Sequence, residues 1–577
     1  MSKNPSDPSA LLEQLKKIRV SKTLELKPTT RLRTEIVGLD GRAQPLRLRY
    51  YQAQGIFHLL LVKRMVLGDS TGLGKTLQAI GFLCYLWDKE AETKAIVLCP
   101  KSAIRQWASE VKRFSTGVQT FVAAGSLEER KAAYEAWAKS PTGLDDPKSI
   151  LITNYHSLVR DWDYGGLSQV EAVRPGAKGA GALKGGLLDT LTSSTSKLVT
   201  IFDESSAFKN PSTKTWQVCR NLSDKSDRVV GLTATLLRNN LMEGFGIYKV
   251  IKPDVFSSKT KFLEQFCVLE MQRVRGGGRV PIVVGYKNLV QFRTMIEPFF
   301  YGRAKHEVSS EMPSLTTREV LVEMSSAEDK KYGEALSGVL ELGDGEIKEY
   351  EDTKALTSLI YCQQCVDSPT LLRYNEGDMI EVGDDVEEVK LGSKEQALLD
   401  LLNDEFDGEK VIVYTRFERL VGRLQKVLQK SKIKSARITG KESDKKRAEA
   451  QAKFQDLKSD TSVIFITDAG SEAINLQAAN ALVFYDSPWS WGNYVQILGR
   501  MIRIGSPHPS VFAVHIVAER PGKKRETIDA AVLRTLRKKK GLIDQIIGEA
   551  AQGALKFDRA EGGGLRELMS EIRRGSV

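Results

Sequence analysis

The sequence predicts an α/β protein with two domains, each built on a parallel sheet, and a mainly helical region between them. Short apolar runs such as AIVLC at 95–99 alternate with helical stretches from about 41 to 250. A second series, which includes KVIVYT at 410–415, occupies 391–520. This alternation is typical of parallel sheets with crossover helices. A chain of 577 residues is also too long for one compact core.

The remaining segments have different compositions. Residues 1–40 are polar and are expected to form an N-terminal arm, and 251–390 a mainly helical protrusion or linker. Within that linker, RVRGGGRVPIVVG has the composition of a hairpin. The tail at 521–577 predicts an amphipathic helix with a basic face. A Gly-rich insertion at 164–196 favours a mobile segment, with a small packed excursion as the alternative.

Composition and charge exclude several classes of protein. The net charge of +12 suits an anionic partner but is also common in proteins that bind none. The apolar run HLLLVKRMVL is interrupted by Lys63 and Arg64, well short of a membrane span, and the N-terminus lacks the apolar region of a signal peptide. We therefore expect a cytoplasmic protein, or a nuclear one in a eukaryote, with no membrane partner.

Cys362 and Cys365 form a lone CxxC, which favours a structural helix over a zinc site.

The strongest local signal is GDSTGLGKT at 68–76, which follows a strand-like run and opens a helix. This is the context that a phosphate-binding loop requires. Gly72 and Gly74 let backbone N–H groups approach a phosphate, and the helix N-terminus adds positive potential. Lys75 is predicted to contact the β and γ phosphates of ATP, and Thr76 to bind Mg²⁺.

The loop pattern is incomplete, because Asp69 stands where GxxxxGK[ST] has its first glycine. A plain glycine turn is therefore the alternative, and a second motif argues against it. The run KLVTIFDES ends a buried strand in Asp203 and Glu204, at the sheet edge where the loop also lies. Asp203 is predicted to bind Mg²⁺, and Glu204 to orient and deprotonate the attacking water.

The second domain supplies QILGRMIRIG, a QxxGRxxR pattern formed by Gln496, Gly499, Arg500 and Arg503. Two arginines three residues apart lie on one face of a helix. Both are predicted to stabilise the transition state at a γ-phosphate, and Gln496 to contribute to nucleotide binding. The alternative is a solvated basic face, which the two preceding motifs make less favourable.

These elements follow one another in the order found in superfamily two helicases, and several segments resemble the Swi/Snf branch. LRLRYYQ at 46–52 is similar to the adenine-recognising LRxYQ element, which puts Gln52 on the base. The other similar segments are CPKSAIRQWASEV at 99–111, ITNYHSL at 152–158, DESSAFKN at 203–210, LTATLLRNN at 232–240, TDAGSEAINLQAANALVFYDSPW at 467–489 and TIDAAVLRTLRKKKGLID at 527–544.

The resemblance implies two RecA-like lobes, ATP and Mg²⁺ as cofactors, and an ATP-dependent translocase on double-stranded DNA. It also implies phosphate contacts from segments of both lobes, with little reading of bases. The side chains expected to contribute these contacts are Lys101, Thr153, Lys209, Thr439, Lys441 and Thr467.

The sequence departs from the family pattern at several positions. Ser206 replaces the His of DExH, Arg238 replaces a Gln, and Ser471 and Glu472 replace family residues. No chromatin-reading module is recognisable, which favours a minimal motor of prokaryotic or viral type that works as a monomer, alone or with other DNA-processing proteins. Two alternatives stay open. One is a strand-separating DNA or RNA helicase, and the other is a nucleotide-dependent binding platform.

Overall fold

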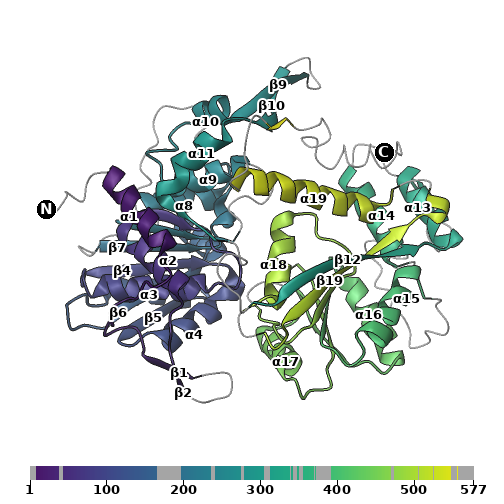
Figure 1. Cartoon of the computed structure of the whole chain (residues 1–577), viewed down its shortest axis with the longest axis horizontal. Coiled ribbons are helices and arrows are strands. Elements are labelled where there is room, and N and C mark those ends of the chain that lie inside the picture. The colour runs from purple at the N-terminus through teal and green to yellow at the C-terminus, as the bar shows by residue number, and fades with distance from the viewer. Residues whose placement is uncertain are drawn as a thin grey trace. The chain divides into compact units, whose positions relative to one another are not determined.

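The computed structural model divides the chain into two compact units (Figure 1). Unit 1 comprises Met1–Leu263 and Val290–Ser309, and unit 2 comprises Glu264–Leu289 and Ser310–Val577. The structure describes residues 8–37, 43–164, 191, 197–234, 241–273, 279–303, 312–337, 339–341, 347–349, 355–368, 371, 391–468, 474–503, 506–523, 526–547 and 555–556. The acidic part of the predicted linker and almost all of the 164–196 insertion lie outside these residues, as do Arg238, Ser471 and Glu472.

Unit 1 contains a seven-stranded sheet in the order β11-β3-β8-β7-β4-β6-β5, and every neighbouring pair is parallel. Every residue of β4 and β6 is buried, which explains their continuous apolar runs. The strands are β3 (Arg64–Leu67), β4 (Thr93–Cys99), β5 (Val118–Ala123), β6 (Lys148–Asn154), β7 (Lys197–Asp203), β8 (Arg228–Leu232) and β11 (Phe300–Tyr301).

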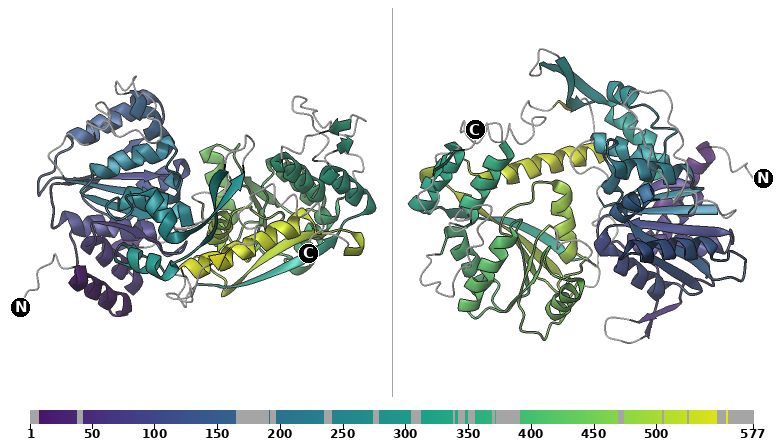
Figure 2. Two further views of the ribbon diagram at one scale, coloured as in Figure 1. Left: turned by 90° about the horizontal axis from the view of Figure 1, so that it is seen from above. Right: turned by 180° about the vertical axis from the view of Figure 1, so that it is seen from behind.

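Helices lie on both sides of this sheet (Figures 1 and 2). Helix α4 shows why they pack there, because Ile104, Trp107, Val111 and Phe114 recur at helical spacing and are all buried. The helices of unit 1 are α1 (Pro8–Val20), α2 (Tyr50–Leu61), α3 (Lys75–Trp87), α4 (Ile104–Phe114), α5 (Leu127–Lys139), α6 (Tyr155–Tyr164), α8 (Lys214–Asp224), α9 (Leu241–Ile251) and α11 (Leu289–Ile296). A short hairpin, β1 (Glu35–Val37) and β2 (Ala43–Pro45), precedes α2.

Unit 2 contains a six-stranded sheet in the order β12-β19-β18-β15-β17-β16, again with parallel pairs throughout. The prediction of two α/β lobes with parallel sheets is confirmed. The strands are β12 (Ser314–Glu323), β15 (Val411–Tyr414), β16 (Ser435–Ile438), β17 (Val463–Ile466), β18 (Ala481–Phe484) and β19 (Ser510–Glu519). The main helices are α13 (Ser326–Ser337), α14 (Ala355–Asp367), α15 (Ser393–Asp400), α16 (Glu418–Lys430), α17 (Asp444–Gln455), α18 (Trp491–Met501) and α19 (Ile528–Ile547).

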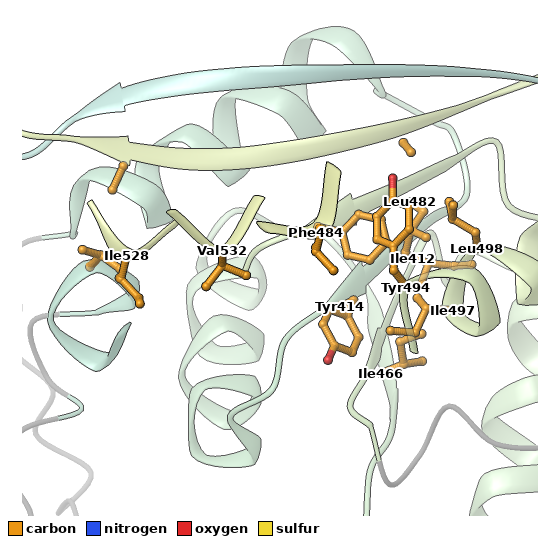
Figure 3. Packing of buried hydrophobic residues seen from close by; sticks show 14 of the residues in the cluster. Ile412, Tyr414, Ile466, Leu482, Phe484, Tyr494, Ile497, Leu498, Ile528 and Val532 are labelled. Atoms are coloured by element: carbon orange, nitrogen blue, oxygen red, sulfur yellow. The ribbon is translucent and has the colours of Figure 1, made fainter. Parts of the chain in front are cut away.

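One core of unit 2 lies between its sheet and the helices α18 and α19 (Figure 3). Tyr414 and Phe484 from the strands pack with Tyr494 of α18, and Ile528 and Val532 of α19 belong to the same cluster. The apolar face predicted for the C-terminal helix is therefore confirmed, and it is buried.

The predicted linker at 251–390 is not the separate helical region that we expected. After α10 (Lys259–Phe266), the strands β9 (Cys267–Arg273) and β10 (Arg279–Tyr286) form the predicted hairpin, and β20 (Leu555–Lys556) pairs with β10. Strand β11 then completes the sheet of unit 1, and β12 begins that of unit 2. A short hairpin, β13 (Val339–Glu341) and β14 (Ile347–Glu349), follows α13.

The lone CxxC lies in a helix, as the sequence predicts. Cys362 and Cys365 are buried in α14, so the lone CxxC forms part of a helix. The described residues include no group of three or more His, Cys, Asp or Glu side chains arranged to hold a metal. None of the helices in the described part of the chain combines the length and apolar character of a membrane span.

Candidate nucleotide site

The phosphate loop lies between the end of β3 and the start of α3, as predicted. Gly72 has a φ of 86° and Gly74 a φ of 77°, which is the left-handed region that favours glycine. Gly74 also lies against Gln52, and a Cβ at position 74 would approach Nε2 of Gln52 to 2.7 Å. Both the backbone conformation and the close packing therefore require glycine at position 74.

Lys75 is the first residue of α3, and its ammonium group folds back over the loop. Nζ donates to the backbone oxygens of Asp69 at 2.6 Å and Ser70 at 3.3 Å. Thr76 follows in the first turn and is half-buried. The N-terminal N–H groups of α3 and the Lys75 ammonium together form a positive surface suited to an anion.

Gln52 lies in α2 and contacts the loop through its side-chain amide. Its Oε1 accepts a hydrogen bond from the backbone N–H of Arg49 at 3.0 Å, and its Nε2 donates to the carbonyl of Leu73 at 3.4 Å. This places the predicted adenine-recognising residue directly beside the phosphate loop. Its contact with the base stays a prediction.

Asp203 ends β7, and two aromatic side chains hold it. Trp107 Nε1 donates to Oδ2 of Asp203 at 2.7 Å, and the Tyr155 hydroxyl donates to the backbone oxygen at 2.7 Å. Desolvation raises the pKa of Asp203 to about 6, and the hydrogen bond from Trp107 opposes this shift. The neighbouring charge of Glu204 raises the pKa further, whereas the charge of Lys75 lowers it. Asp203 is therefore close enough to Lys75 for their charges to interact.

Glu204 adopts a strained backbone conformation. Its φ of 54° and ψ of 61° lie in the left-handed region, which costs a residue other than glycine about 1–3 kcal/mol. The side-chain Oε1 accepts hydrogen bonds from the Ser206 hydroxyl at 2.6 Å and, more weakly, from the Thr233 hydroxyl at 3.5 Å. Ser206, which departs from the DExH pattern, thus supplies a donor that fixes Glu204.

The residues at this edge of the sheet offer oxygen ligands that would suit a magnesium ion. Mg²⁺ is usually bound by one or two carboxylates, substrate phosphates and water rather than by an all-protein cage. Asp203 keeps Oδ1 available, since the hydrogen bond from Trp107 goes to Oδ2. The hydroxyl of Thr76, at the start of α3, is the second predicted ligand.

In unit 2, Arg500 and Arg503 converge on one backbone oxygen. Arg500 Nη1 and Arg503 Nη2 donate to the carbonyl of Ile474 at 3.4 Å and 3.3 Å. Arg503 Nε also donates to the carbonyl of Gly499 at 2.9 Å. The expectation of a shared helix face is wrong, because α18 ends at Met501 and Arg503 lies beyond it. Gln496 lies within α18 and is half-buried.

The threonines predicted to contact nucleic acid are buried. Thr153 is 0% exposed and donates to the carbonyl of Ala123, and Thr439 is 1% exposed and donates to Glu442. Thr467 is 4% exposed. The burial of these side chains does not favour a direct contact of their hydroxyl groups with a DNA phosphate, and their contacts with DNA stay predictions.

The three predicted lysines are more accessible than the threonines. Lys101 is exposed at the start of the 3-10 turn η1 (Lys101–Ala103). Lys209 forms an ion pair with Glu243 at 2.6 Å, and the largely exposed Lys441 forms one with Glu418 at 3.5 Å. Contacts of all three with DNA stay predictions.

The sequence did not reveal two residues that contact the candidate site. Arg303 follows β11, more than two hundred residues from the phosphate loop in sequence, and donates to both carboxylate oxygens of Asp69. No local pattern around Arg303 indicates this contact. Trp107 lies in the segment at 99–111, but the sequence did not show that its indole donates to Asp203.

Comparison with known proteins identifies the family. The sequence model of the SNF2-related domain matches residues 51–371, which is more than half of the chain. The chain belongs to the SNF2-related family. A second match, to the helicase conserved C-terminal domain, covers residues 393–505. The Swi/Snf resemblance is thereby confirmed, and the family implies use of a nucleotide.

Named relatives of this SNF2-related chain come from yeast, mouse and plant. It is 25% identical to the ISWI chromatin-remodeling complex ATPase ISW1 of Saccharomyces cerevisiae, covering 92% of this chain and 43% of the relative. It is 27% identical to the mouse Chromodomain-helicase-DNA-binding protein 1-like, with 90% and 52% covered, and 25% identical to the ATP-dependent DNA helicase DDM1 of Arabidopsis thaliana, with 91% and 65% covered. The chain thus spans about half the length of these relatives.

Among solved structures, the chain is similar to the Sulfolobus solfataricus SWI2/SNF2 ATPase core in complex with dsDNA. The TM-score is 0.36 at 20% identity, and 91% of this chain and 95% of that chain are covered. The same core domain in a second structure gives a TM-score of 0.37 at 18% identity.

Proposed function

We propose that this SNF2-related protein is an ATP-dependent translocase on double-stranded DNA. The observation that carries the proposal is the meeting of the phosphate loop with Asp203 and Glu204 in unit 1. The strands β3 and β7 belong to one parallel sheet, so their carboxyl ends lie at the same edge. A phosphate-binding group and a pair of carboxylates in this arrangement suit the hydrolysis of a nucleoside triphosphate.

Each residue of the site contributes a separate step to this chemistry. The loop N–H groups and Lys75 neutralise charge on the β and γ phosphates, and Gln52 holds the base. Asp203 and Thr76 would hold Mg²⁺, which would reduce the negative charge of the phosphates. Glu204, held by Ser206, accepts a proton from the attacking water. Arg500 and Arg503 stabilise the transition-state charge, as their QxxGRxxR pattern predicts.

DNA as the partner is proposed from the family and from the net charge of +12. Contacts to phosphates make binding tolerant of sequence and steeply dependent on salt, because each neutralised phosphate releases a counterion. Lys101, Lys209 and Lys441 are the proposed side chains, since their amino groups are more accessible than the buried threonines.

The decisive experiment compares triplex displacement with strand separation. A third strand in the major groove is stripped by a motor that tracks along the duplex, whereas unwinding of a tailed duplex reports a helicase. ATP-dependent displacement without unwinding, with turnover stimulated more by duplex than by single strands or RNA, is the expected result. The Glu204→Gln protein serves as the inactive control.

Two other outcomes identify the alternatives. Efficient unwinding of the tailed duplex would assign the protein to the strand-separating helicases. Neither activity, combined with turnover that DNA does not affect, would favour a nucleotide-dependent binding platform.

A further inference from the structure

Backbone hydrogen bonds between the segment 300–303 and the phosphate loop continue beyond the ends of β11 and β3. Phe300 and Tyr301 pair in parallel with Val66 and Leu67 of β3. The ladder then extends into the loop, because the N–H of Gly68 donates to the carbonyl of Tyr301 at 2.7 Å and the N–H of Ser70 donates to that of Arg303 at 3.0 Å. The first residues of the loop are therefore bonded to the segment 300–303 through their backbone.

This backbone contact is too close for side chains at two positions. A Cβ at Gly302 would lie 2.8 Å from the carbonyl oxygen of Gly68. A Cβ at Gly68 would lie 2.4 Å from the ring of Phe300. Glycine at both positions allows the two segments to approach.

The guanidinium of Arg303 then joins the loop to the helices on either side of it. Nε and Nη2 donate to the two carboxylate oxygens of Asp69 at 2.9 Å and 2.5 Å, and this bidentate pair is almost inaccessible to solvent. Nη1 donates to the backbone oxygen of Tyr51 and to Oε1 of Gln54 at 3.0 Å, both in α2. Nη2 also donates weakly, at 3.3 Å, to Gln78 of α3.

Asp69 connects this network to the residue that binds phosphate. Its side chain accepts from Arg303 and, at 2.9 Å, from Gln78. Its backbone oxygen accepts from Lys75 Nζ at 2.6 Å. Displacing Asp69 would therefore move a hydrogen-bonding partner of the Lys75 ammonium as well as the backbone that leads into the loop.

We propose that Arg303 is a positioning residue of the nucleotide site, which holds the phosphate loop in the conformation that receives ATP. The segment that carries Arg303 is also the one from which the chain continues to β12, the first strand of the unit 2 sheet. The inference rests on the proposed nucleotide binding of unit 1 but not on translocation. Arg303 does not contact the reacting atoms in this assignment; it acts through Asp69.

The test uses the full chain and measures ATP affinity directly with a fluorescent ATP analogue, together with KM and kcat. Arg303→Gln is expected to weaken ATP binding and raise KM about tenfold, with a smaller change in kcat, because loop contacts are made in the ground state as well as the transition state. It is also expected to lower the unfolding temperature, since it leaves the Asp69 carboxylate buried without its cation.

A double variant in which both members of the pair are neutral distinguishes a role in positioning the loop from a role in folding. In Arg303→Gln with Asp69→Asn neither member of the pair is charged, so the unfolding temperature is expected to recover while ATP affinity stays low. Recovery of affinity in step with stability would overturn the proposal, because Arg303 would then act only through folding. The same holds if Arg303→Gln leaves ATP affinity unchanged.

The same unit offers a matched control. Arg130 of α5 and Asp161 of α6 form another buried bidentate pair, with hydrogen bonds of 2.7 Å and 2.5 Å. Arg130→Gln is expected to lower the unfolding temperature without changing ATP affinity, and an equal loss of affinity would refute the specific role of Arg303. Nucleotide binding by a wild-type protein that fails to move on DNA would reject the translocase function while leaving this inference open to the same measurements.

Discussion

Trp107 Nε1 donates a 2.7 Å hydrogen bond to Oδ2 of Asp203, and this bond fixes the carboxylate at the end of β7. The indole is only 1% exposed, so the surrounding core holds it rigidly. Outer partners of this kind orient a metal ligand, and their loss typically costs about 10–100-fold in metal affinity or activity.

Trp107→Phe is therefore expected to raise the Mg²⁺ concentration needed for half-maximal ATP turnover by about tenfold. The measurement is a magnesium titration at saturating ATP. Trp137 provides the control, because it is equally buried in the same unit and its Nε1 has no hydrogen-bond partner among the described residues. If Trp137→Phe shifts the magnesium dependence as much as Trp107→Phe does, the hydrogen bond is not the cause.

Glu204→Gln is expected to retain ATP binding and lose hydrolysis, because the loop and Lys75 remain while the proton acceptor is removed. Ser206→Ala keeps the carboxylate but removes its 2.6 Å donor, so we expect a partial loss of kcat with little change in KM. Steady-state kinetics and binding of a fluorescent ATP analogue measure both variants. Parent-like hydrolysis by Glu204→Gln would show that another group activates the water.

Arg500→Ala and Arg503→Ala are expected to slow hydrolysis by roughly 10³–10⁵-fold while changing ATP affinity little, as is typical of groups that act at the transition state. Single-turnover rates and ATP binding distinguish the two effects. Arg318→Ala is a suitable control in unit 2, because this residue pairs with Glu405 at the surface. Affinity that falls as much as the rate would argue for a ground-state role.

The fold was predictable where burial follows the local sequence. Strands such as β4 and β17 are buried at every position, so their apolar runs are visible without any tertiary information. Strand β11 has two residues, which is too short for a periodic signal, and every residue of β12 is exposed or half-buried. The boundary between the units was misplaced because these two strands are recognised only through their partners.

The site was predictable where its chemistry lies in contiguous motifs. Gly74, Lys75, Asp203 and Glu204 follow strands at the same sheet edge, and the sequence shows both the strands and the residues. The partner of Asp69 could not be predicted, because Arg303 comes from a distant segment. Burial of Thr153 and Thr439 was also invisible, since it depends on which neighbours pack over each hydroxyl.

Lys394→Met is expected to destabilise unit 2 by about 3–5 kcal/mol, because it leaves two carboxylates buried without a cation. Lys394 is 1% exposed and donates to Asp367 at 2.9 Å and Asp529 at 2.8 Å, which ties α14, α15 and α19 together. Denaturant unfolding followed by a unit 2 probe measures the loss. Lys330→Met, which removes an exposed pair with Glu334, should change stability by less than about 0.5 kcal/mol.

The buried imidazole of His58 is expected to make unit 1 less stable in weak acid. The ring is 2% exposed, stacks on Tyr301 with centroids 3.8 Å apart, and uses Nδ1 as the donor to the backbone oxygen of Gln54 at 2.8 Å. Burial lowers its pKa to about 3; the Gln54 hydrogen bond opposes the shift, and Arg19 and Arg303 add to it. In the unfolded chain the imidazole regains a pKa of about 6.5.

Between these two pKa values the unfolded state binds one proton more than the folded state, so stability falls as the pH decreases. Between about pH 7 and about pH 5, this imidazole is expected to lower the free energy of unfolding by roughly 2 kcal/mol. His58→Phe keeps an aromatic ring for stacking but cannot titrate, so its stability should depend less on pH by this amount. Denaturant unfolding at both pH values, followed by a unit 1 probe, is the measurement, with substitution of the exposed His156 as the control. An unchanged pH dependence in His58→Phe would mean that other groups cause the acid destabilisation.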